Sequence, residues 1–479
     1  MSHFRNAIYR NAQVALFAGA AAAVLSACAS VPHLGAAPQP KASSAYAASQ
    51  SFAAPAAEWP ADRWWDAYGD AQLKGLIDEA LSGAPTLVQA EARVRKAQSF
   101  AEQTGASLKP QLGAEASVME SKQSYNQGVP SAFVPHGWRE VGRAGLDLSW
   151  QLDLFGKNRA LLKAATSETQ AARADAAFTR LQLSTAVAGA YADLAQLYAD
   201  RDAAQEAVRV RYEGEQLIGQ RYTQGLETKA AYERAHAGRA AGEAQLAALD
   251  EAIGLTRNNI AALLGQGPDR GLMIARPNPG AIRAFGLPQN LAADLMGRRP
   301  DVVAARLAAE AAGQRIKAAK ADFYPNVNLM GFLGAQSLGL DMLTKSGSTL
   351  GAFGPAVSLP IFSGGRLEGA YRGARADYDA AVAAYDATLT QALREVADAA
   401  VSSRALDARL AKSREALTAS ETAYDLARQR YARGLGTYLE VLAAEDALVA
   451  DRRAVADLET RAFTLDVALV RALGGGFHA

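Results

Sequence analysis

The sequence predicts a mainly α-helical fold, internally duplicated, in which long helical hairpins alternate with pairs of β-strands. The first observation is a nine-residue pattern, Q-R-Y-x-x-G-L-x-T, that occurs at 220–228 and again 209 residues later at 429–437. The second is that each copy lies between two long, alanine-rich segments that contain no proline. Ala favours helices, and Gly ends them by adopting a left-handed conformation. Each copy is therefore predicted to be the tip of a helical hairpin.

The composition excludes several functional classes. Among 479 residues, 50 Lys and Arg balance 49 Asp and Glu, so a nucleic-acid partner has no electrostatic support. The single cysteine, Cys28, excludes a disulfide within the chain and a Cys-based metal site, and the five histidines have no ligand spacing. No phosphate-binding loop, nucleophile elbow or paired catalytic constellation is present. We therefore expect no enzymatic activity, no cofactor and no metal.

The N-terminus reads as a targeting segment. A basic start and an apolar stretch at 14–25 precede the residues Leu25-Ser26-Ala27-Cys28. Residues 1–27 are predicted to be a signal peptide, which is too short to span a membrane. The four residues are similar to a bacterial lipobox, so Cys28 is predicted to become the lipidated first residue; the alternative is an ordinary signal peptide with an incidental cysteine. Residues 28–68 would form a lipidated tether, flexible in its part rich in Ala, Pro and Ser.

The first structural repeat is assigned to residues 69–275. Leu146, Leu148 and Trp150 alternate with polar residues, which predicts a strand whose polar face, including Asp153, is solvated. Helices are expected at 70–82, 85–108, 157–222 and from the first tip to 264; strands are expected at 112–118 and 146–154; a loop is expected at 121–142 and a connector at 265–288. The aromatic cluster before this repeat, Trp59, Trp64, Trp65 and Tyr68, is assigned to local packing.

The helix over 157–222 would be roughly 95 Å long, because each residue of an α-helix rises 1.5 Å. A helix of that length cannot be buried in an ordinary globular domain. Its apolar residues follow alternating steps of three and four, the pattern of a coiled-coil seam. They are Leu183, Val187, Ala190, Leu194, Leu197, Ala204 and Val208.

The second structural repeat, 276–479, has the same order of elements. A short helix is expected at 288–297, and Pro300 with Asp301 begins another that runs to 322. Strands are expected at 327–333 and 353–361, the latter bent because it contains two prolines. A long helix is then expected over 366–431, followed by the second tip and a helix to 473.

Four strands are too few to close into a barrel around a lumen, and membrane strands cannot leave their edges unpaired in lipid. Three chains would supply a twelve-stranded trimeric β-barrel with an apolar outer face and a polar, water-filled interior. The long helices, which are too exposed in a single chain, could pack side by side into a tube.

Several stretches carry a resemblance to a known family. They are Gly286-Leu287-Pro288, Arg298-Arg299-Pro300-Asp301-Val302, Trp150-Gln151-Leu152-Asp153-Leu154-Phe155-Gly156, Leu359-Pro360-Ile361-Phe362-Ser363-Gly364-Gly365-Arg366, and the pattern Y-x-x-G-L-x-x-Y-L-x-V-L from Tyr431 to Leu442. Together with Cys28 they cover nearly the whole chain. The chain resembles the lipoprotein outer membrane factors of resistance-nodulation-division (RND) efflux systems, the NodT-like relatives of TolC.

That resemblance implies a homotrimer with a β-barrel in the outer membrane and an α-helical tunnel in the periplasm. It also implies docking to a periplasmic adaptor protein and to an inner-membrane RND transporter. The chain would then be a passive conduit for small molecules. Two alternatives remain at this point: a type I secretion channel for polypeptides with the same fold, and a periplasmic coiled-coil adaptor, which would have a single hairpin.

The resemblance also implies roles for residues near the tips. Contact with the adaptor is expected at Tyr222, Gly225, Leu226, Tyr431, Gly434 and Leu435. Asp425 and Arg428, three residues apart on one helix face, are candidates for the periplasmic gate; otherwise they would form a surface ion pair of little energetic weight. The two tips differ at Glu227, which aligns with Gly436, so they could serve different purposes, one for gating and the other for anchoring.

Overall fold

The computed structural model describes residues 31–126, 128, 130–278, 285–289 and 291–478. Cys28 lies outside these residues. Two compact units can be distinguished. The sheet unit holds Arg95–Ala171 and Arg306–Ala384, with the described residues up to Gln39; the hairpin unit holds Pro40–Val94, Ala172–Ala305 and Tyr385–Ala479.

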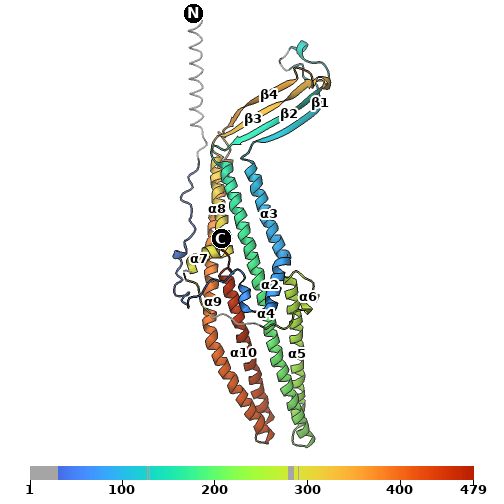
Figure 1. The fold of residues 1–479 in the computed structure, drawn as a ribbon, viewed down its shortest axis with the longest axis vertical. Helices are drawn as coiled ribbons and strands as arrows, with labels where there is room; N and C mark the ends of the chain where they lie inside the picture. Colours follow the sequence, from blue (N-terminus) through green and yellow to red (C-terminus); the bar gives the residue numbers. More distant parts are fainter. Residues whose placement is uncertain (1–30, 127, 129, 279–284, 290, 479) are drawn as a thin grey trace. The chain divides into compact units, whose positions relative to one another are not determined.

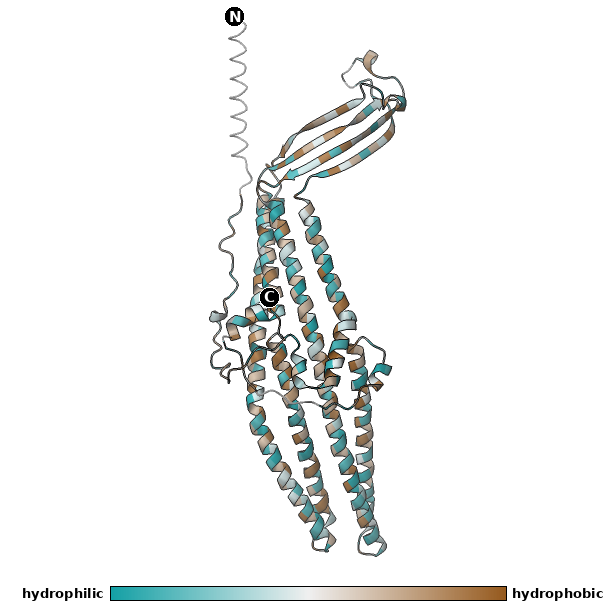
Figure 2. Cartoon of the chain, in the orientation of Figure 1, coloured by the Kyte–Doolittle hydropathy of each residue, from teal (hydrophilic) through white to brown (hydrophobic). Residues whose placement is uncertain are grey.

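The sheet unit contains four antiparallel strands in the order β1-β2-β3-β4, as Figure 1 shows. The strands are β1 (Gln111–Ser121), β2 (Arg139–Leu152), β3 (Asn326–Leu338) and β4 (Thr349–Ser358). Residues that lie opposite one another point to the same face, so rungs alternate in polarity. Trp150, Leu329 and Pro355 form one rung. The next rung, Gln151–Asn328–Ala356, points to the other face. Figure 2 shows the resulting alternation of hydropathy along the strands.

All four strand predictions were wrong in at least one bound. β1 ends at Ser121 instead of 118, and β3 ends at Leu338 instead of 333. β2 begins at Arg139, inside the predicted loop 121–142. The prediction missed this start because the first half of β2 carries glycines in place of an apolar alternation. Gly145 is needed there, since a Cβ atom would lie 2.5 Å from the Phe332 ring. β4 ends at Ser358, so Pro360 lies beyond it, and Pro355 is tolerated because β4 is an edge strand.

β2 also ends two residues earlier than predicted, at Leu152. Asp153 is not on a solvated face. Its carboxylate accepts hydrogen bonds from the backbone N–H groups of Asn158 and Arg159, at 3.0 and 2.9 Å. It therefore caps the first turn of the following helix.

The helices agree closely with the predicted ranges. They are α2 (Ala71–Gly83), α3 (Pro85–Ala106), α4 (Lys157–Thr223), α5 (Lys229–Leu263), α7 (Leu291–Arg298), α8 (Pro300–Ala321), α9 (Arg366–Ala432) and α10 (Tyr438–Ala472). A short helix, α6 (Asp269–Leu272), lies in the predicted connector. In the part of the chain that the structure describes, no helix has the length and apolarity needed to cross a membrane.

The apolar core of the hairpin unit consists of separate clusters. Trp64, Trp65 and Tyr68 are almost fully buried in one of them, against α2, α4, α5 and α10, which confirms local packing for these three. Trp59 is partly buried against a different cluster. Val187 and Leu194 of the predicted seam are also fully buried. The seam is therefore where α4 meets the rest of the unit.

Arg299, in the motif before α8, is a buried structural residue. Its side chain is 4% exposed and makes two hydrogen bonds to Asp301, at 2.9 and 2.6 Å. A third bond, of 2.7 Å, reaches Glu395 on α9, and a longer one reaches the carbonyl of Ala472 at the end of α10. The motif thus ties α8 to both helices of the second hairpin.

The described part of the predicted flexible tether is held by side chains of α9. In the sheet unit, Arg375 donates to the carbonyl of Gly35 at 3.4 Å. In the hairpin unit, Arg404 donates to the carbonyl of Ser51 at 3.2 Å. These carbonyls have no helix or strand partner of their own, so arginine side chains can satisfy them. These parts of the predicted tether therefore contact α9, and its flexibility stays a prediction.

Candidate functional site

The tips of the two hairpins, α4–α5 and α9–α10 in Figure 1, have the same backbone geometry. Gly225 and Gly434 both have φ of 75°, in the left-handed region that favours glycine. Leu226 N donates to the carbonyl of Arg221 at 2.8 Å, and Leu435 N donates to the carbonyl of Arg430 at 2.9 Å. This is the Schellman arrangement that ends a helix. Both glycines are therefore required by the turn itself.

Four of the six predicted tip residues have a large side chain. Of these four, the two leucines that follow the glycines are the most exposed. Leu226 is 62% exposed and Leu435 is 66% exposed. Neither is needed to form the turn, because only the backbone of each takes part in the cap. They are thus available for contact with another protein.

The two tip tyrosines, which have equivalent positions in the repeated pattern, lie in different surroundings. Tyr431 is 2% exposed, whereas Tyr222 is 39% exposed. The Tyr431 hydroxyl donates to Glu227 Oε1 at 3.0 Å, and the guanidinium of Arg221 lies 4.9 Å from the centre of its ring. Burial, and then the bond to Glu227, raise the pKa of Tyr431 to about 12. Its hydroxyl is therefore protonated at neutral pH and acts as a donor.

An apolar cluster, which we call the tip cluster, joins the two hairpins. Its buried members come from both: Ile218, Ala235, Tyr424, Tyr431, Tyr438, Val441 and Leu448. Only Ile218 and Ala235 belong to the first hairpin, so the second hairpin supplies most of the apolar surface. The sequence did not identify this cluster, although Tyr424 and Tyr431 are seven residues apart on α9, a spacing that places both on one helix face and is a usable signal.

Arg211 forms a charged tie between the hairpins. From α4, its Nε atom donates to Glu445 Oε1 on α10 at 2.7 Å, and its Nη2 atom lies 3.2 Å from Asp446. Its third contact is the carbonyl of Gly238 on α5, at 3.3 Å. Burial raises the pKa of Glu445, and Arg211 only partly opposes that rise. Sequence reasoning missed this tie because its partners are 234 residues apart.

A second buried carboxylate lies within the first hairpin. Glu215 accepts from Arg239 Nε at 2.5 Å and lies 2.8 Å from His236 Nδ1. Burial alone would raise the pKa of Glu215, but the hydrogen bonds from His236 and Arg239 outweigh burial and lower it. Glu215 is thus an ionised, internally satisfied group and not an acid or base poised for chemistry.

The two gate candidates are exposed and are not bonded to each other in the described part of the chain. Arg428 Nη2 lies 3.4 Å from Glu213 Oε2 on α4, and both side chains are about half exposed. Asp425, on the same helix, is also exposed. Arg428 therefore bridges the two hairpins, and Asp425 presents a free face to solvent.

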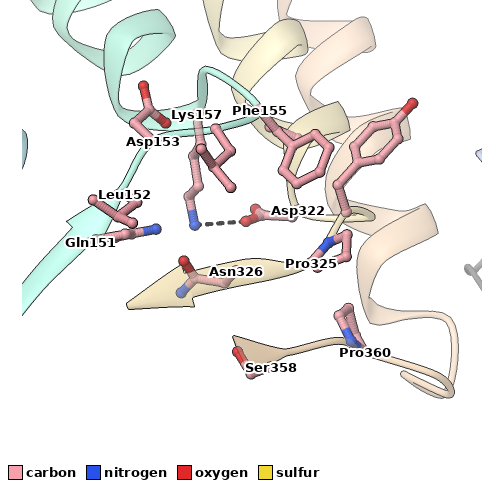
Figure 3. Close-up of a pocket in the computed structure, with 13 residues that line it drawn as sticks. Gln151, Leu152, Asp153, Phe155, Lys157, Asp322, Pro325, Asn326, Ser358 and Pro360 are labelled. Carbon is pink, nitrogen blue, oxygen red and sulfur yellow. Dashed lines mark ion pairs between the residues drawn. The ribbon is translucent and has the colours of Figure 1, made fainter. Parts of the chain in front are cut away.

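A small notch lies in the sheet unit, where strand ends meet helix ends (Figure 3). It has a volume of about 90 Å³ and is lined on one side by Gln151, Asn326 and Ser358. Lys157 and Asp322 form an ion pair of 2.6 Å across it. The notch is too small for a drug-sized ligand. Among the described residues, no group of three or more His, Cys, Asp and Glu is arranged to hold a metal ion.

Comparison with known proteins gives a consistent result. A family model described as outer membrane efflux protein matches residues 76–266 and 291–475. The multidrug resistance outer membrane protein MdtP of Escherichia coli (strain K12) is 29% identical over 428 residues, which are 88% of each chain. The fusaric acid resistance protein FusA of Burkholderia cepacia is 37% identical over 316 residues, which are 65% of this chain but 59% of that protein.

A solved structure has the same fold. The crystal structure of the outer membrane protein VceC from Vibrio cholerae superposes with a TM-score of 0.83. It is 46% identical in sequence, and the match covers 88% of this chain and 100% of that one.

Proposed function

Because the chain belongs to the outer membrane efflux protein family, we propose that three copies of it assemble into one passive conduit of a tripartite efflux pump. The protein is the outer membrane component of such a pump, and it is located in the outer membrane. The observation that carries the assembly is the four-stranded sheet, whose edge strands β1 and β4 each leave one side for another chain. Three such sheets would supply a barrel of twelve strands.

The rungs of the sheet support this arrangement. The face with Trp150, Leu329 and Pro355 suits lipid, and the face with Gln151 and Asn328 suits a water-filled lumen. Paired edges leave no backbone group without a partner in the bilayer.

The tips are the proposed contact with a periplasmic adaptor protein, which would link the conduit to an inner-membrane RND transporter. Exposed Leu226 and Leu435 supply apolar side chains, while Gly225 and Gly434 hold the backbone that presents them. Tyr222 is half exposed beside them, but Tyr431 is buried, so its contribution to an adaptor contact would be indirect.

Asp425 and Arg428 are proposed to narrow the periplasmic aperture. In a trimer each would form a ring of three like charges, and the free face of Asp425 would suit such a position. The bridge from Arg428 to Glu213 supplies a link between hairpins that must break if they separate.

Cys28 is proposed to carry the lipid. Gly35, which Arg375 holds, is seven positions after Cys28, and seven extended residues span at most about 25 Å. Arg375 is nine residues into α9, about 14 Å from the first residue of that helix. The lipid can therefore reach the level of the strand ends, where a membrane-embedded barrel would meet the inner leaflet.

The proposed cargo is small organic molecules, by analogy with the resistance to fusaric acid and to multiple drugs in the names of two relatives. The two alternatives are less well supported. A periplasmic adaptor would not carry two hairpins, and the two relatives MdtP and FusA are named as resistance proteins.

The test is purification of the lipidated protein from outer membranes in mild detergent. Native mass spectrometry should give a mass of three chains, and the protein should form conducting channels in planar bilayers. A stable monomer would contradict the barrel. The secretion alternative would be favoured if the protein is a trimer and deletion of its gene stops export of a polypeptide but leaves drug susceptibility unchanged.

A further inference from the structure

The duplication supplies the residues of the contact between the two hairpins twice, once in each tip. The contact within one chain uses only one of these two sets. In the observed contact, Arg221 of the first tip covers the Tyr431 ring of the second tip. A shift of 209 residues converts Tyr431 into Tyr222 and Arg221 into Arg430. The same two residue types thus exist a second time, with their roles exchanged between hairpins.

The second set is not assembled within the chain. Tyr222 stacks on Tyr232 of its own hairpin, with ring centres 5.9 Å apart, and is otherwise 39% exposed. Arg430 is exposed, and its Nη2 atom donates to the carbonyl of Leu435 in its own tip, at 3.1 Å. An exposed aromatic ring on the first hairpin and an exposed guanidinium on the second are therefore not in contact with each other within the chain.

We propose that Tyr222 of one protomer packs against the second tip of the neighbouring protomer, under Arg430 of that protomer. This inference rests on the proposed homotrimer. In a closed ring of three chains, each first hairpin has two neighbours, the second hairpin of its own chain and the second hairpin of the next chain. The occupant of the exposed Tyr222 surface is thus a second copy of this chain, bound through the counterpart of the contact already seen within the chain.

The contact between protomers differs from the one within a protomer in one decisive bond. Within the chain, Glu227 accepts the hydrogen bond of the Tyr431 hydroxyl. The residue that corresponds to Glu227 in the second tip is Gly436. At this position the neighbouring tip offers the Tyr222 hydroxyl no counterpart of Glu227, so the contact lacks the counterpart of this hydrogen bond.

The contact between protomers is also more polar. Three members of the tip cluster, Tyr424, Tyr438 and Leu448, correspond in the first hairpin to Glu215, Lys229 and Arg239. Charged groups at these places cannot be buried as cheaply as the apolar side chains they replace. The seam between protomers is therefore expected to be weaker than the contact inside each protomer.

A photo-crosslinking experiment tests the contact. The photoreactive amino acid p-benzoylphenylalanine replaces Tyr222 in one variant and, as the matched control, Tyr431 in another, and each protein is purified without adaptor. Illumination of the Tyr222 variant should give covalent dimers and trimers whose linked peptides include residues 429–440 of a second chain. The Tyr431 variant should link only within its own chain.

The contact is refuted if the Tyr222 variant is trimeric by native mass and still gives no link between chains. A monomeric native mass would refute the homotrimer itself, and with it this contact.

A gain of the missing bond provides an independent test. Gly436 does not have a left-handed φ, and a Cβ atom there would first meet the flexible end of Glu440 at 3.1 Å, so a side chain can be accommodated. Gly436→Glu should restore an acceptor for Tyr222 of the neighbour and lower the resting conductance of the trimer at least two-fold. Gly436→Ala controls for the added Cβ. The double variant Gly436→Glu/Tyr222→Phe should return to the conductance of the Ala control; if it keeps the low conductance, Tyr222 is not the donor and the proposal fails.

Discussion

The hydroxyl of Tyr431 donates a hydrogen bond to Glu227 at 3.0 Å, and this bond joins two hairpin tips whose residues are 204 positions apart in the sequence. The Tyr431 hydroxyl and the Glu227 carboxylate both have restricted access to water. Leaving either group without a hydrogen-bond partner there would lower the stability of the fold. The equivalent tyrosine of the other tip has no such bond. The hydrogen bond between Tyr431 and Glu227 therefore distinguishes two tips that have the same backbone conformation.

Tyr431→Phe should loosen the tips. The change removes one hydrogen bond and leaves Glu227 without its donor, at a cost of about 1 kcal/mol or somewhat more. We expect a higher resting conductance in planar bilayers and faster amide exchange in residues 218–240. Tyr222→Phe is the matched control and should leave the exchange within one chain unchanged, because Tyr222 is exposed. Equal effects of the two substitutions would contradict a special role for Tyr431.

Asp425→Ala combined with Arg428→Ala should raise the resting conductance at least two-fold, because the double variant removes two charged rings from the aperture and breaks the bridge to Glu213. Glu213→Gln is the control that breaks the bridge and keeps both gate candidates; it also removes the exposed ion pair of Glu213 with Arg209, which lies within α4. If Glu213→Gln reproduces the whole increase, the bridge between hairpins is the barrier. Unchanged conductance in the double variant would remove both residues as gate candidates.

Arg299→Ala should destabilise the hairpin unit by roughly 3–5 kcal/mol, because it leaves Asp301 and Glu395 as uncompensated carboxylates in a buried site. The expected measurement is a large fall in the thermal unfolding temperature or failure to assemble. Arg306→Ala is the control: Arg306 forms an exposed ion pair with Glu310 on the same helix, and its loss should cost less than about 1 kcal/mol.

Stability should fall in acid through Glu395. Burial alone would raise the pKa of Glu395, but the charge and hydrogen bond of Arg299 outweigh it and lower the pKa below the ordinary value of 4.5. A carboxyl whose pKa is lower in the folded state contributes stability that is complete above pH 4.5 and is lost as the pH falls through the folded value. The melting temperature should therefore drop below that pH, and Glu395→Gln should flatten the drop. Glu310→Gln, at the exposed pair, should not change its slope.

Cys28→Ser should abolish incorporation of radiolabelled fatty acid, because the thiol is the proposed site of acylation. Channels formed by the unlipidated protein should keep their conductance, since the barrel is built from other residues. Continued labelling of the variant would show that the lipid is elsewhere or that the N-terminus is processed as an ordinary signal peptide.

Local patterns were enough to predict much of the fold. Proline-free helices of 67 residues and the glycines that end them can be identified from periodicity and turn chemistry, and α4 and α9 agree with prediction to within one residue at each end. The start of β2 could not be predicted, because Gly142 and Gly145 interrupt the apolar alternation. A Cβ atom at Gly145 would lie 2.5 Å from the Phe332 ring, and one at Gly142 would lie 2.9 Å from the end of the Leu340 side chain, so contacts from distant parts of the chain favour glycine there.

The sequence by itself determined where the two tips are and that their backbones are alike, because a capped helix end depends on residues within one turn of it. It also identified Leu226 and Leu435 as tip residues. It did not show that Tyr431 is buried and bonded to Glu227 while Tyr222 is exposed, or that Arg428 pairs with Glu213 and not with Asp425. These contacts depend on how the two hairpins pack against each other, which brings together residues about 200 positions apart in the sequence. Only the tertiary structure decided that packing.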